Sequence, residues 1–146
     1  MTTTRKKTVR HNFTILCDQV ILDKADRPSI IGAIRNLVFD VLPGDVPRLA
    51  ILVSFTASPG QKYFVAIEDP RRKELVRFDD QDVLSPSAHA DGRATHMIFE
   101  TYFVANVQNA RFETEGIHHV VVRVGGRTIR REPFGVSLRR SRRTKE

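Results

Sequence analysis

The stretch "ETEGIHHVVVRVGGRTIRREPFGV", residues 113–136, decides the fold. Valine-rich residues 117–124 precede the Gly-Gly pair at 125–126, and "RTIRRE" follows it. Valine and isoleucine are enriched in strands, and two glycines between two such runs are typical of a two-residue β-hairpin turn. This segment therefore predicts an antiparallel hairpin, and Pro133 within it predicts a sheet edge or a bulge.

The same segment contains two adjacent histidines, His118 and His119. Successive side chains of a strand point to opposite faces of the sheet, so His118 shares a face with Val120 and Val122, and His119 does not. The pair is therefore not expected to bind one metal ion. We expect His118 to be a buried, hydrogen-bonded structural residue, and His119 to face solvent or a partner.

Outward from this hairpin, the rest of the chain also consists of strand-like runs separated by turn formers. Residues 48–57 alternate, with Leu49, Ile51, Val53 and Phe55 on one face, and residues 94–108 form the longest strand candidate. "SPGQ" at 58–61 and "DPRRKE" at 69–74 are predicted turns. The strand candidates are residues 12–22, 30–42, 48–57, 62–69, 75–78, 94–108, 117–124, and a last run of 127–132 and 134–138 interrupted by Pro133. They predict an all-β, antiparallel two-sheet sandwich of seven to eight strands.

The net charge of +7 is concentrated at the two ends of the chain. Residues 1–10 and 139–146 carry nine of the 24 Lys and Arg residues and one acid, which leaves the body near neutral. We therefore divide the chain into a basic tail (1–11), a sandwich domain (12–138) and a second basic tail (139–146), and we expect disorder in both tails. The tails are either solubilising ends or flexible contacts for nucleic acid or another polyanion. The candidate polyanion contacts are Arg5, Lys6, Lys7, Arg10, Arg127, Arg130, Arg131, Arg139, Arg140, Arg142, Arg143 and Lys145.

The single cysteine, Cys17, cannot form an internal disulfide and favours a reducing compartment. The apolar run that contains it is broken by Asp18 and Gln19, which argues against a signal peptide. No run approaches the length of a membrane span, so we expect a cytoplasmic protein. Because alternation places Cys17 and Asp18 on opposite faces, they are not expected to act together in catalysis.

Residues 79–93 form the longest irregular segment, and long loops are often functional. They are the first candidate interface on length alone. Their Asp residues lack the spacing of a calcium-binding loop, and His89 and His96 flank Asp91 at no recognised zinc spacing. The candidate interface residues are Asp79, Asp80, Asp82, His89, Asp91 and Arg93.

Motifs for phosphate binding, dinucleotide binding, serine hydrolysis or zinc proteolysis are absent from the sequence. The aromatic residues are nine Phe and two Tyr without Trp, a composition suited to a core rather than to a binding platform. We therefore expect no enzymatic activity, no cofactor, no metal and no small-molecule substrate.

Gly116, Ile117 and His118 occupy the step at which immunoglobulin-like sandwiches have a G-x-Tyr corner, with His in place of Tyr. With "LCDQVILDKADRPSIIG" (16–32), "PRLAILVSF" (47–55), "VAIEDP" (65–70) and residues 112–136, the chain resembles a family of small uncharacterised bacterial proteins. The resemblance implies an immunoglobulin-like sandwich and no established activity. The chain departs from that pattern at His118 and at "DPRRKE", where the family tends to have an Asp-Pro-x-Gly turn.

The sequence favours a non-enzymatic module that binds another protein, or a second copy of itself, through an edge strand or end loops. The alternative is an accessory nucleic-acid binder that uses the tails together with Arg127, Arg130 and Arg131.

Overall fold

The computed structural model describes residues 9–25, 27–82 and 99–140 of the chain. These residues form strands and turns without a helix, as expected of an all-β protein. The strands are β1 (Arg10–Leu22), β2 (Pro28–Ile34), β3 (Asn36–Phe39), β4 (Gly44–Ala57), β5 (Lys62–Glu68), β6 (Glu74–Asp82), β7 (Phe99–Phe112), β8 (Gly116–Val124) and β9 (Arg127–Leu138).

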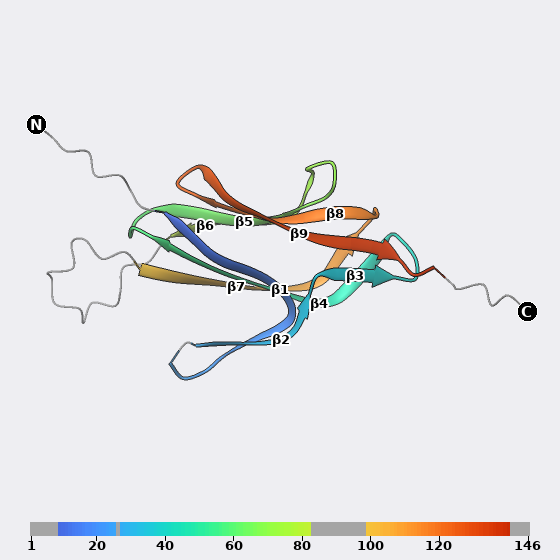
Figure 1. Cartoon of the computed structure of the whole chain (residues 1–146), viewed down its shortest axis with the longest axis horizontal. Helices are drawn as coiled ribbons and strands as arrows, with labels where there is room; N and C mark the ends of the chain where they lie inside the picture. Colours follow the sequence, from blue (N-terminus) through green and yellow to red (C-terminus); the bar gives the residue numbers. More distant parts are fainter. Residues whose placement is uncertain (1–8, 26, 83–98, 141–146) are drawn as a thin grey trace, which may run out of the picture.

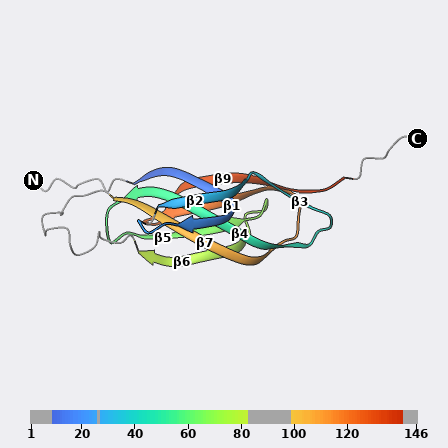
Figure 2. The same cartoon turned by 90° about the horizontal axis from the view of Figure 1, so that it is seen from below.

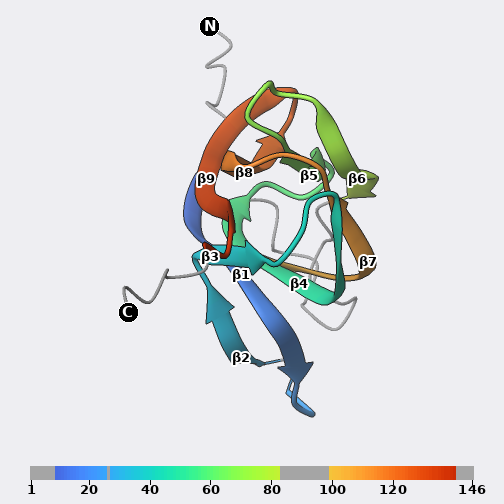
Figure 3. The same ribbon diagram turned by 90° about the vertical axis from the view of Figure 1, so that its right-hand side faces the viewer.

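The strands form two packed sheets (Figure 1). Sheet A has the order β2-β1-β4-β7, and sheet B has the order β3-β9-β8-β5-β6. Sheet B is curled, so that its far strand β6 approaches β7 of sheet A (Figure 3). Seen from below, the strands of the two sheets overlap along an elongated body (Figure 2).

The core lies between the sheets and follows the predicted alternation. Four β4 side chains are fully buried against Val65 and Ile67 of β5 and against every second valine of β8; they are Leu49, Ile51, Val53 and Phe55, and the valines are Val120, Val122 and Val124. The opposite face of β4 is also buried, because Ala50, Leu52 and Ser54 have no exposed surface. A sheet that packs against the core on one face only would expose this second face to solvent, so other parts of the chain must cover it.

β1 pairs with β4 as far as Cys17, and the part of the β1–β2 hairpin beyond this pairing lies on the side of sheet A that faces away from sheet B, where it covers part of that face (Figures 1 and 3). Val20 of β1 packs with Cys17, Ala50 and Leu52 in a second apolar cluster. Phe13, Ile15 and Val104 flank this cluster. The hairpin is thus fastened to the domain by its own small core.

The prediction of one strand over residues 30–42 is wrong. The chain changes sheets at Arg35, whose carbonyl oxygen accepts a hydrogen bond from the N–H of Gly135 at 2.9 Å. β2 pairs with β1 in sheet A, whereas β3 pairs with β9 in sheet B, and the β3–β9 pairing is parallel rather than antiparallel. The division yields nine strands among the described residues instead of seven or eight.

The two turns predicted at residues 58–61 and 69–74 make different kinds of connection. The segment 58–61 is not a hairpin turn, because it carries the chain from β4 in sheet A to β5 in sheet B. The segment 69–74 does join paired strands, β5 and β6. The Gly125-Gly126 hairpin is confirmed, and both glycines have positive φ, as a primed turn requires.

Candidate functional site

The free edge of β2 is the candidate site. β2 ends sheet A, and its sequence "PSIIGAI" contains no charged side chain. Five of its seven residues are exposed and the other two are half-buried. An edge strand leaves backbone N–H and C=O groups unpaired, and these groups can pair with a strand from another chain.

The hairpin register shows where these unpaired groups lie. The N–H of Asp23 donates to the carbonyl of Arg27 at 3.1 Å, which makes that pair hydrogen-bonded. Antiparallel pairs alternate, so the pair Val20 and Ile30, three steps further along, is not hydrogen-bonded within the hairpin. The N–H and C=O of Ile30 therefore point away from β1, toward the open edge.

Exposed apolar side chains accompany this edge. Ile30 is 38% exposed and Ile31 is 48% exposed on β2. Ile21 and Leu22 on β1 are 45% and 48% exposed. Because adjacent strand residues point to opposite faces, Leu22 and Ile30 lie on one face of the hairpin and Ile21 and Ile31 on the other, so each face presents two exposed apolar side chains.

The turn that joins the two strands is fixed by Asp23. Its Oδ1 accepts hydrogen bonds from the N–H groups of Ala25 and Arg27 at 2.8 and 2.9 Å. Its Oδ2 accepts a hydrogen bond from Arg27 Nε at 2.8 Å, and these bonds lower the pKa of Asp23. Asp23 thus ties the end of β1 to the residues before β2, and Arg27 is already paired.

Gly32 in the middle of β2 has an unusual neighbour. Its φ is +68°, and an ideal Cβ on Gly32 would lie 2.3 Å from Oδ2 of Asp18 on β1. The Asp18 carboxylate therefore occupies the space of a side chain at position 32. Asp18 is exposed and makes neither a hydrogen bond nor an ion pair with any residue that the structure describes.

Cys17, next to Asp18, is buried as expected of a small apolar side chain. Its thiol donates to the carbonyl of Ala50 at 3.7 Å. Burial raises the pKa of Cys17, and the charge of Asp18 contributes in the same direction. This combination favours the neutral thiol and supports a structural role.

The two histidines point to opposite faces, as predicted. His118 is fully buried, and its Nδ1 lies 3.1 Å from the carbonyl oxygen of Gly116. Its ring packs against Phe112 and Phe134, each with a centroid separation of 5.5 Å. The predicted burial and hydrogen bond of His118 are therefore both present.

His119 lies half-buried on the outer face of sheet B. It sits opposite Glu68, which lies 3.0 Å from a guanidinium nitrogen of Arg131. Burial lowers the pKa of His119, and the positive charge of Arg131 lowers it further.

The predicted polyanion contacts are not gathered in one patch. Arg130 and Arg131 are neighbours on β9 and face opposite ways, Arg130 in an ion pair with Glu132 and Arg131 in one with Glu68. Arg127 lies near Val9 at one end of the molecule, whereas Arg139 and Arg140 follow β9 at the other (Figure 1). Arg10 belongs to β1 rather than to a tail. Arg5, Lys6, Lys7, Arg142, Arg143 and Lys145 lie outside the described residues.

The described part of the predicted interface loop is a strand. Asp79, Asp80 and Asp82 belong to strand β6, not to a loop. His89, Asp91 and Arg93 lie outside the described residues.

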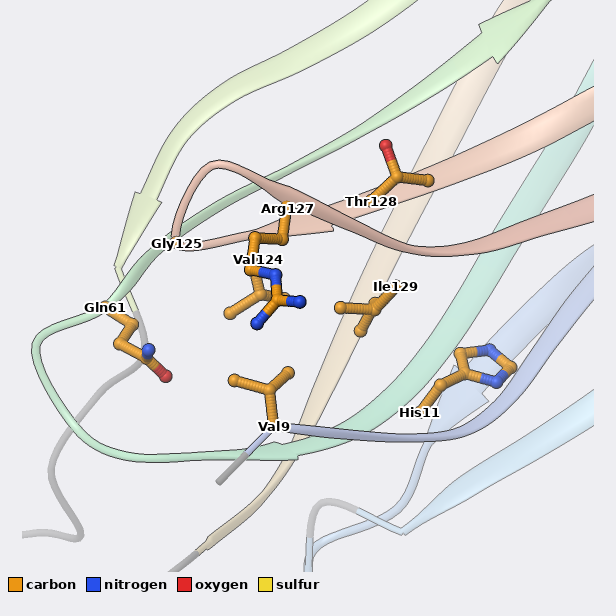
Figure 4. Close-up of a pocket in the computed structure, with 8 residues that line it drawn as sticks. All are labelled: Val9, His11, Gln61, Val124, Gly125, Arg127, Thr128 and Ile129. Atoms are coloured by element: carbon orange, nitrogen blue, oxygen red, sulfur yellow. The ribbon is translucent and has the colours of Figure 1, made fainter. Parts of the chain in front are cut away.

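A cavity of about 690 Å³ opens beside the turn between β8 and β9 (Figure 4). Val9, Val124 and Ile129 give it an apolar lining, and Arg127 and His11 add polar groups. Burial, and then the charge of Arg130, lowers the pKa of His11. Nε2 of His11 lies 2.8 Å from the Thr14 hydroxyl. No described residue of this lining was predicted as a site except Arg127.

Within the described ranges, no three His, Cys, Asp or Glu side chains come together in a way that would hold a metal ion. Nor does this part of the chain contain a helix with the length and hydropathy of a membrane span.

Sequence reasoning missed the β2 edge, although a signal was present. The run "PSIIGAI" is uncharged and lies between Arg27 and Arg35, directly after the turn formers of "DKADR". Charged side chains are a usual protection of an exposed edge strand, and this run has none. The proximity of Gly32 in this run to Asp18 follows only from the register of β1 and β2.

Fold and site together define an all-β protein of two packed sheets with a free, uncharged edge strand on a protruding hairpin. The family of unknown function DUF6941 matches residues 12–137, and the chain belongs to that family. No curated protein matches the sequence. The expectation of an uncharacterised family is thus confirmed, and the family supplies no activity.

Proposed function

We propose that this chain is a non-enzymatic protein-binding module that recruits a partner strand along the free edge of β2. Strand addition to an exposed edge is a common way to recognise an extended segment, because backbone hydrogen bonds supply affinity and side-chain pockets supply specificity. The single observation that carries the proposal is the uncharged, exposed edge of β2.

The other three sheet edges support this choice by contrast. The β7 edge carries Glu100 and Arg111, and the β6 edge carries the ion-paired Arg77. The β3 edge is only four residues long. Charges and shortness are the usual protection against unwanted strand pairing. Among the described strands, β2 alone combines a free edge of seven residues with the absence of charge.

The support beneath the hairpin favours binding without large rearrangement. Val20 is 8% exposed and packs on Ala50 and Leu52, while Asp23 fixes the turn. A strand that is already ordered loses little conformational entropy when a partner adds to it.

We also propose that the sandwich is immunoglobulin-like. The parallel pairing of β3 with β9, the change of sheet between β2 and β3, and the buried His118 two residues after Gly116 support this assignment. In this assignment β1 and β3 are the two halves of the first strand, one in each sheet, and the β1–β2 hairpin is inserted between them.

Site-specific photo-crosslinking in the source organism tests the binding function. A photoreactive phenylalanine analogue replaces Ile31 in one variant and Ile117, which is 55% exposed on β8, in the control. We expect a discrete crosslinked partner from position 31 and none from position 117. The crosslink should disappear with Ile30→Pro, which removes an outward N–H, and persist with Ile30→Val. Equal crosslinking from both positions, or persistence with Ile30→Pro, would contradict the proposal.

For the alternative, a polyanion binder, Arg10, Arg127 and Arg140 are predicted contacts that form no ion pair with another described residue. Because Arg127 and Arg140 lie at opposite ends of the molecule, that hypothesis relies on the tails as well. Removal of residues 1–8 and 141–146 should then abolish nucleic-acid binding and its steep salt dependence.

A further inference from the structure

We infer that the partner strand carries a lysine or arginine opposite Gly32, and that Asp18 binds it. This inference rests on the proposed strand addition at β2 and names the chemistry of the partner. It assigns Asp18 as the residue that selects the partner.

The position of the Asp18 carboxylate is the first observation. Asp18 lies between Cys17 and Gln19, whose register partners on β2 are Ala33 and Ile31, so Asp18 stands opposite Gly32. Its Oδ2 lies within 2.3 Å of the ideal Cβ position on Gly32. The negative charge that belongs to β1 is thus displayed on β2, one strand closer to the open edge.

The charge balance is the second observation. Asp18 has no cationic partner among the described residues, although Arg27, Arg35 and Lys24 are exposed on or beside the hairpin. Arg27 pairs with Asp23 instead. On the next strand, about 4.8 Å away, a basic side chain directly opposite Gly32 reaches the carboxylate, and cross-strand pairs of opposite charge are stabilising.

A second copy of this chain is the less favourable occupant. A two-fold axis at Ile31, the midpoint of β2, places Arg27 opposite Arg35 of the other copy. Moving the axis to Gly32 brings together the two carboxylates of Asp18, each beside its own Gly32. Like charges directly opposite each other on neighbouring strands are destabilising, so both registers are opposed.

Three cyclic β-hairpin peptides that differ only at the centre of the free edge provide the test. They carry lysine, glutamine or glutamate there, among alternating threonine and valine. Binding is measured at low salt by titration of ¹⁵N-labelled full-length protein, with the amide signals of Ile30 and Ile31 as reporters. Asp18→Asn is the test variant. Asp45→Asn is the control, because Asp45 is an exposed acid at the far end of sheet A and the charge change is the same.

We expect the lysine peptide to bind about twofold to fivefold more tightly than the glutamine peptide, with the glutamate peptide weakest. Asp18→Asn should remove this preference and leave the affinity for the glutamine peptide unchanged, and Asp45→Asn should retain the preference. A preference that survives Asp18→Asn, or is absent from the wild type, overturns the role of Asp18 while strand addition stands. If no peptide shifts the signals of Ile30 and Ile31, strand addition itself is overturned, and the inference with it.

Discussion

The corner at which β8 begins depends on Gly116 and His118. Gly116 has φ of +129°, and a Cβ there would lie 2.8 Å from the ring of Pro70. The His118 imidazole bonds to the Gly116 carbonyl and fills the space between Phe112 and Phe134. The backbone conformation of Gly116, its hydrogen bond with His118 and the aromatic packing of His118 thus all act on residues 116–118.

His118→Ala is expected to reduce the free energy of unfolding by about 2–4 kcal/mol, because it leaves a cavity and removes a buried hydrogen bond. The neighbouring Ile117→Ala should change it by less than about 0.5 kcal/mol, since Ile117 is exposed. Urea denaturation of both variants measures the difference. Equal losses would mean that His118 has no special structural role.

Arg72 has a strained backbone conformation in the turn between β5 and β6. It has φ of +66° in the turn between β5 and β6, where its N–H donates to the carbonyl of Asp69. The Asp69 side chain fixes this turn through the N–H groups of Arg71 and Lys73. Left-handed backbone is unfavourable for a residue with a Cβ.

Arg72→Gly is therefore expected to raise the free energy of unfolding by about 0.5–1 kcal/mol, the relief of strain less the added entropy of the unfolded chain. Arg71→Gly, next to it without positive φ, should lower that free energy instead. Thermal unfolding of the two variants distinguishes these outcomes. Stabilisation by both, or by neither, would contradict the assignment of strain to Arg72.

The hairpin of β1 and β2 depends on the apolar cluster around Cys17 and Val20. This dependence makes the Cys17 thiol a reporter, because a fully buried thiol reacts only after the hairpin opens. The raised pKa of Cys17 slows the reaction further, since the thiolate is the nucleophile.

Val20→Ala is expected to weaken the packing by about 1.5 kcal/mol and to speed Cys17 alkylation in the native protein about tenfold. Val38→Ala is the control, because Val38 is exposed on β3 and lies outside this cluster. The alkylation rate with a thiol reagent at constant pH is the measurement. An unchanged rate in Val20→Ala would show that the cluster does not hold the hairpin.

A comparison of the β8–β9 hairpin with the β1–β2 hairpin shows how far the sequence predicts the structure. Two-residue alternation and paired glycines are local signals, and they correctly predicted the burial of His118 and the turn at Gly125. The change of sheet at Arg35 has no local signal, because residues 30–42 are apolar on both sides of it. The closeness of Asp18 and Gly32 depends on pairing across 14 positions of the chain, so the candidate site was not predictable from composition or motif.

Across the whole domain, two histidines link stability to pH. Burial is the main cause of the lowered pKa values of His11 and His119, with Arg130 and Arg131 as the next causes. A lowered pKa in the folded state means that the unfolded chain binds more protons below the ordinary value of 6.5. The contribution of these groups is therefore complete above that pH and decreases as the pH falls through it.

The free energy of unfolding should accordingly be lower at pH 5 than at pH 7.5, and His119→Gln should reduce this difference. Urea denaturation of the wild type and the variant at both pH values isolates the contribution of His119, because the pH dependence from all other titratable groups is the same in the two proteins. If both proteins lose equal stability, His119 is not part of the pH dependence.

The parallel pairing of β3 with β9 has a mechanical consequence. The two strands run in the same direction, and the start of β1 and the end of β9 lie at opposite ends of the molecule (Figure 1). Tension applied through the ends draws β3 back by its first residue and β9 forward by its last. The hydrogen bonds between them then bear the load together in shear instead of being peeled open one after another, so this short ladder resists further stretching once tension has drawn β1 and β2 out of sheet A.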